Sequence, residues 1–353
     1  MDLDEWRSRI NEIDQQILSL LNQRAAAALR IGALKRQQDL PYYVPEREAE
    51  VIARLLTLDS GPFPEEGVKA VWREILSASL ALEQPLVVAY LGPPATFSHQ
   101  AATLRFGSSA HCLPGKSVVE VFEEVERERA EFGVVPVENS TEGSVNITLD
   151  RLMDSELVIT GEIFLDISLH LLSRASDLSQ IRTVWSHPQA LAQCRQWLGT
   201  NLPDAPVAEV TSTAAAAGQA LGDPTGAAIA SELAARVYQL PVLRSRIEDN
   251  VFNSTRFLVM GRRPMPPTGK DKTSILCSVK HEVGALAKFL EPFARHGLNL
   301  TKIESRPTKR RPWEYVFFVD FEGHRDTPPV QAVLTEIRER CLFLKTLGSY
   351  PAT

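Results

Sequence analysis

Apolar side chains recur every three or four positions over the first 38 residues, as on one face of a long helix. They run from Leu3 through Trp6, Ile10 and Ile13 to Leu34. About 35 residues at 1.5 Å each span roughly 50 Å, more than a small domain covers with its own chain. We therefore expect partner helices or a second subunit to bury part of this face.

Two shorter helices are predicted next, over about 45–58 and 65–82, separated by the breaker-rich stretch 59–64. From Leu86 the pattern changes, and short β-like runs alternate with helical patterns, which is typical of α/β units on parallel or mixed sheets. The β-like runs are 87–91, 132–137, 157–164, 183–186, 227–230 and 257–260, and the helical patterns include 118–127 and 190–198.

A linker rich in proline and glycine is predicted over 261–269. Beyond it the order β-α-β-β-α-β is that of a ferredoxin-like fold. Its predicted elements are 273–280, 284–295, 298–305, 313–322, 328–340 and 342–347. The fold class is therefore multidomain, with an all-α domain at residues 1–85, an α/β domain at 86–262 and an α+β domain at 272–350.

Composition fits this division, because 353 residues with 44% hydrophobic and 23% charged side chains suit two or three globular domains. The net charge of −6 argues against nucleic-acid binding, and the short cluster 309–311 is interpreted as a solvated loop. Neither a signal peptide nor an apolar run of ~20 residues is found, which predicts a cytoplasmic protein. The four cysteines lack CxxC spacing, so we expect no metal site and no disulfide framework.

Three cations on the long helix, Arg7, Arg24 and Lys35, occupy positions that its amphipathic pattern does not require. At 100° per residue, Arg24 and Lys35 lie about 20° apart and share a face. Arg7 lies about 100° away and ~25 Å along the axis from Arg24. A partner subunit is therefore better placed to supply Arg7 to a ligand held by the other two.

This segment resembles the all-helical chorismate mutase family, through these cations, Pro45-Glu46-Arg47-Glu48, Ser79 and Glu83. The resemblance implies an intertwined homodimer in which Arg7 crosses into the partner's site. Rearrangement of chorismate to prephenate would be electrostatic and conformational, with no nucleophile or metal. The implied catalytic residues are Arg24, Lys35, Glu48 and Glu83, and the implied chorismate-binding set is Arg7, Arg24, Lys35, Arg47, Glu48, Ser79 and Glu83.

Two positions depart from the family pattern. Val44 stands where an acidic residue often contacts the substrate hydroxyl, so that contact is expected to be absent. Glu83 stands where many members have Gln, and a carboxyl group donates to the ether oxygen only when it is protonated. We therefore expect mutase activity to fall as the pH rises.

The α/β region resembles prephenate dehydratase, in segments spread along its length. They are Tyr90-Leu91-Gly92-Pro93 with Thr96-Phe97-Ser98, the run 133–140, Ser186-His187-Pro188-Gln189, and Thr255-Arg256-Phe257. The resemblance implies two lobes around a cleft, as in periplasmic binding proteins, whose closure excludes water. Ala95 replaces the usual Gly and Pro94 an unhindered residue, so we expect a stiffer loop there.

Prephenate loses its ring carboxylate as CO2 while its hydroxyl leaves as water, which requires a proton donor and carboxylate anchors. By resemblance Thr255 is the donor or relay and Arg256 is a candidate anchor. Because a threonine hydroxyl is a weak acid, a neighbour must polarise it, and Glu138 is one candidate. The implied prephenate-binding set is Thr96, Ser98, Glu138, Asn139, Ser140, Ser186, Gln189, Thr255, Arg256 and Phe257.

The C-terminal segment resembles an ACT regulatory domain, through Gly284-Ala285-Leu286 and Glu304-Ser305-Arg306-Pro307. Val283 replaces a frequent Pro. The resemblance implies feedback inhibition by L-phenylalanine bound at a dimer interface. The implied regulatory residues are Gly284, Ala285, Leu286, Glu304, Ser305 and Arg306.

The whole chain thus resembles the bifunctional chorismate mutase/prephenate dehydratases, in the same domain order. Chorismate and prephenate are the expected substrates, L-phenylalanine is the expected effector, and no cofactor, nucleic acid or membrane is expected. Two alternatives remain open at this point. One is a dehydratase acting on arogenate, the amino analogue of prephenate, and the other is a phenylalanine-sensing protein with decayed catalytic domains.

Overall fold

The computed structural model describes residues 2–38, 42–43, 45–58, 61–250, 252–280, 282–307 and 315–352. Val44 and the cluster 309–311 lie outside this range. The chain packs into two compact units, one of Met1–Val87 with Thr103–Cys112 and one of Val88–Ala102 with Leu113–Thr353. The α/β region and the C-terminal domain thus share one unit, whereas residues 103–112 belong with the N-terminal helices.

The helical unit consists mainly of α1 (Leu3–Gln37), α2 (Pro45–Leu58) and α3 (Glu65–Glu83). Helix α1 starts at a capping box, in which Asp2 accepts from the Glu5 amide (2.9 Å) and Glu5 accepts from the Asp2 amide (2.8 Å). A Cβ on Gly32 would lie 3.0 Å from Glu83 Cβ, so α1 and α3 approach closely there. The single long helix predicted from the sequence is confirmed.

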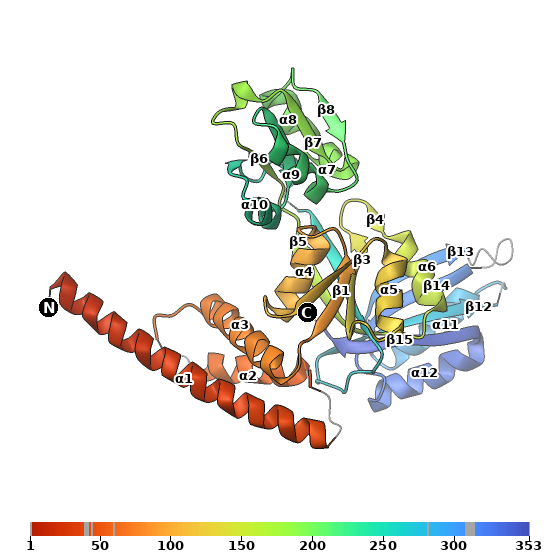
Figure 1. Cartoon of the computed structure of the whole chain (residues 1–353). Helices are drawn as coiled ribbons and strands as arrows, with labels where there is room; N and C mark the ends of the chain where they lie inside the picture. The colour runs from red at the N-terminus through yellow and green to blue at the C-terminus, as the bar shows by residue number, and fades with distance from the viewer. Residues whose placement is uncertain are drawn as a thin grey trace. The chain divides into compact units, whose positions relative to one another are not determined.

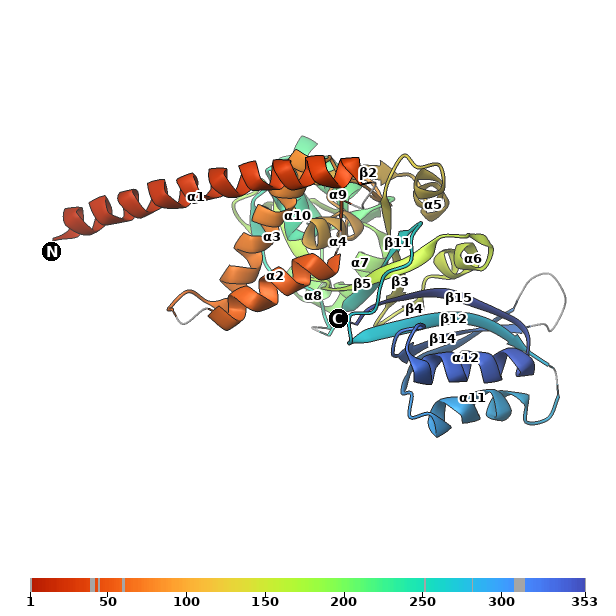
Figure 2. The same ribbon diagram turned by 90° about the horizontal axis from the view of Figure 1, so that it is seen from below.

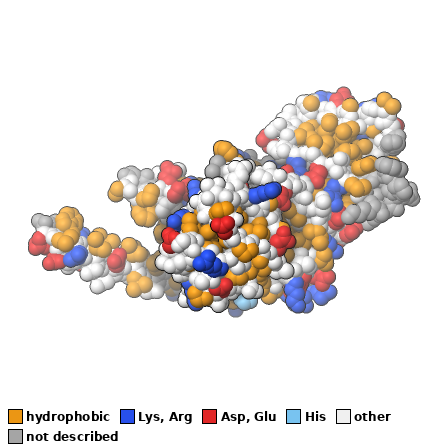
Figure 3. Space-filling model, turned by 90° about the horizontal axis from the view of Figure 1, so that it is seen from above, with side chains coloured by type: hydrophobic (Ala, Val, Ile, Leu, Met, Phe, Trp, Pro, Cys, Tyr) orange, Lys and Arg blue, Asp and Glu red, His pale blue; other side chains and the backbone are white. Residues whose placement is uncertain are grey.

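Most of the apolar stripe of α1 remains exposed. Trp6 is 54% exposed, Ile10 56% and Ile17 49%. In Figure 3, hydrophobic side chains are visible along the projecting arm that ends at the N-terminus. Exposed apolar area of this extent is typical of a surface that another chain covers.

Residues 103–112 pack on α3 of the helical unit. The buried Ser77 hydroxyl donates to Phe106 O (2.7 Å) and accepts from the Ser109 amide (3.3 Å). Glu74 accepts from the Ser108 amide (3.1 Å). The segment therefore supplies partners for the buried Ser77 hydroxyl and for the exposed Glu74 carboxylate of α3.

The α/β region forms two lobes, each built on one sheet (Figure 1). The first sheet has the order β2-β1-β3-β11-β5, with β4 on β3. Its strands are β1 (Val87–Leu91), β2 (His111–Gly115), β3 (Phe132–Asn139), β4 (Gly143–Ser144), β5 (Val158–Asp166) and β11 (Ser254–Gly261). Its helices are α4 (Phe97–Phe106), α5 (Val118–Glu126) and α6 (Asn146–Asp154).

The second sheet has the order β10-β6-β9-β7-β8. Its strands are β6 (His170–Ser173), β7 (Thr183–Ser186), β8 (Val207–Glu209), β9 (Gly226–Ala230) and β10 (Val242–Arg244). The helices of this lobe are α7 (Pro188–Gln193), α8 (Arg195–Asn201), α9 (Thr213–Gly222) and α10 (Glu232–Tyr238), with a 3-10 turn at Leu178–Gln180. Buried alanines of α9, α10 and β9 fill the core between helices and sheet.

The helical pattern predicted over 190–198 is confirmed, but it is divided between two helices. Helix α7 ends at Gln193, and α8 begins at Arg195. Asp249, from the segment before β11, accepts from the amides of Gln196 (2.8 Å) and Trp197 (3.0 Å). Since a carboxylate at a helix N-terminus satisfies unpaired amides, this distant residue fixes the start of α8.

The C-terminal domain is an antiparallel sheet in the order β13-β14-β12-β15, with two helices on one face (Figure 2). Its elements are β12 (Asp271–Val279), α11 (Ala285–Arg295), β13 (Leu300–Pro307), β14 (Tyr315–Glu322), α12 (Pro328–Arg340) and β15 (Cys341–Pro351). Phe289, Phe293 and Phe321 pack between helices and sheet. The predicted β-α-β-β-α-β order is confirmed.

The cysteines of the described chain are free thiols. Burial raises the pKa of Cys194, so this thiol stays protonated. Within the described residues there is no cluster of His, Cys, Asp and Glu suited to a metal ion. No helix there is long and apolar enough to cross a membrane.

Candidate active sites

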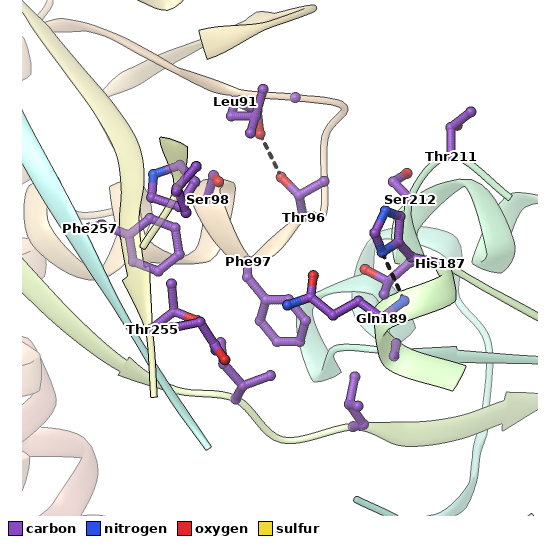
Figure 4. Close-up of a pocket in the computed structure, with 18 of the residues that line it drawn as sticks. Leu91, Thr96, Phe97, Ser98, His187, Gln189, Thr211, Ser212, Thr255 and Phe257 are labelled. Carbon is purple, nitrogen blue, oxygen red and sulfur yellow. Dashed lines mark hydrogen bonds between the residues drawn. The ribbon is translucent and has the colours of Figure 1, made fainter. Parts of the chain in front are cut away.

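A cavity of about 440 Å³ lies between the two lobes of the α/β region. The first lobe contributes Thr96, Ser98, Asn139, Thr255 and Phe257, and the second contributes His187, Gln189, Ser212 and others. In Figure 4, Thr255 and Phe257 lie on one side of this cavity, and His187, Gln189 and Ser212 lie on the other. The volume is within the range of small-molecule sites.

Thr255 is held by Asn139 across neighbouring antiparallel strands. The two residues are register partners, and Asn139 Nδ2 donates to Thr255 Oγ1 (2.9 Å). Asn139 Oδ1 accepts from the amides of Thr141 (3.0 Å) and Glu142 (3.2 Å), which fixes the orientation of the amide group. Because Oγ1 is the acceptor in its contact with Asn139, that contact does not use the hydroxyl hydrogen, and Thr255 lines the cavity.

Glu138 and Arg256 occupy the opposite face of the same strands. They are paired with each other between β11 and β3, and this pair is adjacent to the pair of Thr255 and Asn139. Because successive side chains of a strand point to opposite faces, the two pairs lie on opposite faces of the sheet. Glu138 pairs with Lys302 (2.7 Å), and Arg256 pairs with Glu162 (2.8 Å) and Asp320 (2.7 Å). The expectation that Arg256 anchors substrate in this cavity and that Glu138 polarises Thr255 is therefore corrected, since Asn139 supplies that contact.

The other residues expected at this site divide into two groups. Thr96, Ser98 and Gln189 line the cavity, and Thr96 Oγ1 donates to Leu91 O (2.9 Å; Figure 4). Ser186 is buried and donates to Ile229 O (2.7 Å), so its hydroxyl supports the second sheet. Ser140 donates to Phe252 O (3.1 Å) and accepts from the Ser254 amide (3.0 Å), which ties the loop after β3 to the start of β11.

Lys116 and the N-terminus of α9 are cavity features that the sequence did not reveal. Lys116 follows β2 and is the one cationic side chain among the described residues that line the cavity. Ser212 caps α9, accepting from the Ala215 amide (3.0 Å), and Ser212 and Thr213 also line the cavity. Helix N-termini attract anions, so these groups suit a carboxylate.

Ala95 has a backbone φ of +70° and is fully buried. Its amide donates to His99 Nδ1 (3.1 Å), and its carbonyl accepts from Ser231 Oγ (3.3 Å). This region of φ favours glycine, which explains why the family usually has Gly where this chain has Ala95. Ala95 is therefore the strained point of the loop.

A second group of candidate residues lies in the helical unit. Arg24 on α1 donates to Ser79 Oγ on α3, and its guanidinium lies 5.7 Å from the Trp72 ring centroid. Lys35 donates to Tyr42 O (2.9 Å) and to Glu83 (3.2 Å). The predicted shared face of Arg24 and Lys35 is thus directed at α3.

Glu48 on α2 is partly buried, and its environment includes Tyr43 and Arg105. Burial raises the pKa of Glu48, against the opposing effects of Arg105 and a hydrogen bond with Tyr43. Arg105 was not expected here, because it follows the helical segment in sequence by a long interval. Because residues 103–112 pack on α3, Arg105 lies near Glu48 in the helical unit.

Arg7 and Arg47 are exposed. Arg7 pairs with Asp4 (3.3 Å) near the start of α1, and Arg47 pairs with Glu50 (2.9 Å). Arg24 lies 17 residues further along the helix, about 25 Å away. One chain therefore does not bring Arg7 to the face that carries Arg24 and Lys35.

The chain matches three family models, namely chorismate mutase type II over residues 6–84, prephenate dehydratase over 88–265 and ACT domain over 273–339. It is 52% identical over 354 residues to the bifunctional chorismate mutase/prephenate dehydratase of Aquifex aeolicus, covering 99% of this chain and 98% of that protein. The chain belongs to the bifunctional chorismate mutase/prephenate dehydratase family. The helical unit accordingly holds its mutase domain, and the cavity lies in its dehydratase domain.

Two solved structures resemble the dehydratase and ACT domains together. The prephenate dehydratase of Arthrobacter aurescens in complex with L-Phe is 35% identical, covers 76% of this chain and 90% of that chain, and has a TM-score of 0.70. GqqA, a quorum quenching acylase, is 33% identical, covers 76% of this chain and 98% of that chain, and has a TM-score of 0.70.

The regulatory residues expected in the ACT domain fall on different faces of its sheet. Gly284, with a φ of +77°, caps α11 ahead of Ala285 and Leu286. Ser305 is exposed and pairs with Phe317, which packs on the helical side. Glu304 and Arg306 instead contact the dehydratase domain, at Ser144 and at Asn146 and Asp150.

Glu48→Gln in the mutase domain should raise the midpoint of thermal unfolding at pH 7 by about 2–4 °C. The raised pKa means that folding disfavours the charged carboxylate. That penalty is fully present above the folded-state pKa and is lost below the ordinary glutamate value, so the gain should vanish near about pH 4. Calorimetry at both pH values measures it, with the exposed Glu50→Gln as control. A lower midpoint at pH 7 would contradict the expectation.

Proposed function

We propose that this protein converts chorismate to prephenate in its helical unit and prephenate to phenylpyruvate in the cavity between the α/β lobes, under inhibition by L-phenylalanine. The observation that carries the second activity is the Thr255 hydroxyl, which lines the cavity and accepts from Asn139 in a contact that does not use its hydrogen. Similarity to bifunctional relatives over 99% of the chain supports both activities together.

In the mutase reaction the substrate is a dianion, and the charge that develops in the transition state lies on its ether oxygen and enolpyruvyl group. Arg24 and Lys35, both partly buried on one face of α1, suit this electrostatic role. Glu48 accepts from the ring hydroxyl, and Ser79 orients Arg24. Lys35 donates to the ether oxygen as its bond breaks, and Glu83 holds the Lys35 ammonium in place.

The mutase site is completed in a homodimer. The exposed apolar stripe of α1 supports this assembly, because a second copy of α1 would cover it. Arg7, exposed at the far end of α1, and Arg47 would then reach the carboxylates of a substrate bound across the interface. The free cysteines support a reducing compartment, and we place the enzyme in the cytoplasm.

In the dehydratase reaction the bond between the ring and its carboxylate breaks, and CO2 leaves. The electron pair of that bond forms the last ring double bond as the hydroxyl leaves. Thr255 supplies or relays the proton that converts this hydroxyl to water. One prephenate and one proton thus give phenylpyruvate, CO2 and water.

The carboxylates of prephenate are held by Lys116 and by the amides and hydroxyls at the N-terminus of α9. Gln189, Thr96 and Ser98 supply further hydrogen bonds from the two sides of the cavity (Figure 4). Phe257, beside Thr255 on the same strand face, packs against the ring. No metal or cofactor is required for either step.

Lys116→Met should raise the KM for prephenate by about 10-fold or more, with a smaller change in kcat, because it removes a charge-assisted contact to a carboxylate. Steady-state kinetics on prephenate measures both constants. Arg236→Met, which removes an exposed cation of α10, is the matched control and should leave both unchanged. An unchanged KM in Lys116→Met would exclude Lys116 as the anchor.

L-Phenylalanine is proposed to bind the ACT domain at Gly284, Ala285, Leu286 and Ser305. A Cβ built on Gly284 would meet no atom of the described residues within 4 Å, so a ligand backbone can approach the start of α11 closely. The similar Arthrobacter aurescens structure contains L-Phe, which supports this effector. Glu304 and Arg306, on the dehydratase side of the sheet, connect the same strand to the catalytic domain.

One assay tests the whole proposal. Purified protein is given chorismate, and chorismate loss and phenylpyruvate formation are followed separately, with and without L-phenylalanine. Both signals are expected, and the second should fall with L-phenylalanine. Prephenate accumulation would refute the dehydratase, and binding of L-phenylalanine without either reaction would identify a sensor. Comparing turnover of prephenate and arogenate decides the substrate of the second site.

A further inference from the structure

Successive side chains of strand β11 face two different parts of the protein, the dehydratase cavity and the ACT sheet. Thr255 and Phe257 face the cavity, and Arg256 between them faces the ACT sheet. The pairing of β11 with β3 also shifts register between Arg256 and Phe257, so the strand is irregular at this point. Its local geometry is therefore set by contacts on both faces.

The Arg256 guanidinium closes a ring of hydrogen bonds with three ACT side chains. It donates to Asp320 Oδ2 (2.7 Å) and to Tyr350 Oη (3.0 Å), and Ser274 Oγ donates to Asp320 Oδ1 (2.6 Å). The remaining contact joins Tyr350 Oη and Ser274 Oγ (2.7 Å). Because a carboxylate only accepts, the single hydrogen of the Ser274 hydroxyl is donated to Asp320. Tyr350 must therefore donate to Ser274, so each hydroxyl of the ring has one defined acceptor.

A second ion pair balances the charge of this ring. Glu162 on β5 accepts from Arg256 Nε (2.8 Å) and from Lys272 Nζ on β12 (2.7 Å). The Glu162 side chain is fully buried, and those of Arg256 and Asp320 are each 9% exposed. Two cations and two anions thus lie together, three of them buried and Lys272 partly buried, so that loss of one partner leaves another charge unpaired.

The ACT sheet is held against the dehydratase strands at two further points. A Cβ on Gly348 of β15 would lie 2.2 Å from Ile159 O of β5, so the two backbones are in direct contact. Lys302 of β13 binds Glu138, the register partner of Arg256. A shift of the ACT sheet therefore cannot leave the outer face of β3 and β11 unchanged.

We propose that Arg256 is a positioning residue, through which Asp320 and Tyr350 of the ACT domain fix β11 and so the place of Thr255 in the cavity. This inference rests on the proposed dehydratase activity. It assigns the ACT domain a part in basal catalysis as well as in inhibition. When the ring breaks or shifts, Thr255 should move relative to Asn139 and to substrate, and turnover should fall.

Kinetics separate this role from direct substrate binding. Misplacement of a reacting group by about 1 Å costs on the order of 100-fold in rate, whereas loss of a substrate anchor raises the KM. Asp320→Asn keeps the shape of the side chain and removes its charge. It should lower the dehydratase kcat by about 10- to 100-fold, keep the KM for prephenate within about 3-fold, and weaken inhibition by L-phenylalanine.

Tyr350→Phe is the second variant, since it removes one hydroxyl from the ring and no charge. It should lower the dehydratase kcat by about 3- to 10-fold, with the same small change in KM and the same weakening of inhibition as in Asp320→Asn. Glu336→Gln, which removes a carboxylate from the helical side of the ACT domain, is the matched control. Mutase activity, measured on each preparation, reports the concentration of intact chain and should stay unchanged.

Wild-type protein is assayed first, so that failure of the proposed function is recognised by its lack of turnover on prephenate. With active wild type, normal kcat and normal L-phenylalanine inhibition in both variants would overturn the inference. A raised KM with unchanged kcat in Asp320→Asn would also overturn it. Should Asp320→Asn fail to fold, Tyr350→Phe alone decides between these outcomes.

Discussion

Thr255→Val should lower the dehydratase kcat by about 10²- to 10⁴-fold, the usual contribution of a positioned acid. Valine keeps the branched shape of threonine on β11, so the strand and the Phe257 contact should persist. Asn139 loses its acceptor at 2.9 Å, but it retains Asn253 Oδ1 at 2.9 Å. Steady-state assay of phenylpyruvate formation measures the loss.

The same chain supplies the control for Thr255→Val. Its mutase activity should equal that of wild type, since no mutase residue is altered. Thr255→Ser restores the hydroxyl on the same backbone and should recover most of the activity. A kcat in Thr255→Val within about 10-fold of wild type would fall below the usual contribution of a general acid and would assign the proton transfer to another group.

Lys35→Met should lower the mutase kcat by about 10²- to 10³-fold, the loss typical of removing one preorganised electrostatic donor. Lys35 is the cation that contacts Glu83 at 3.2 Å and is oriented by the Tyr42 carbonyl. Chorismate consumption measures the loss. Dehydratase turnover of added prephenate should not change.

Removing Lys35 also leaves Glu83, whose side chain is 10% exposed, without its cation. Lys35→Met/Glu83→Gln therefore separates lost catalysis from lost stability, because the double variant has no buried unpaired charge. It should regain stability and stay inactive. Lys69→Met on the exposed face of α3 is the control. Normal mutase activity in the double variant would exclude Lys35 from catalysis.

The three-part organisation was predictable, because periodicity and turn signals act locally. The 35-residue helix α1 and the β-α-β-β-α-β order of the ACT domain follow from apolar spacing. The break between α7 and α8 was not predictable, since Asp249 makes it from about 50 residues away. A cap supplied through space leaves no local signal in sequence.

The two charged residues that were expected at the dehydratase site show which information a family motif supplies and which it lacks. Resemblance selected Glu138 and Arg256, but it did not say which face of the strand they occupy. The period of two in a strand, applied to Thr255, Arg256 and Phe257, would have placed the arginine opposite its neighbours. The contact of Thr255 with Asn139 depends on register between β3 and β11, which the sequence does not state.

Lys116 and Arg105 were missed for a related reason. Neither belongs to a recognised motif, and each acquires its place through the packing of a distant segment. Ala95 was singled out as a departure from the family pattern, and its φ of +70° supplies the physical reason.

The ten residues Thr103–Cys112 constrain how the gene for this enzyme could be divided. A cut after α3 would yield a mutase without the groups that satisfy Ser77 and Glu74, and with a buried hydroxyl deprived of its acceptor. It would also remove Arg105 from beside Glu48. A mutase fragment that ends after α3 is therefore expected to be less stable than one that keeps residues 103–112.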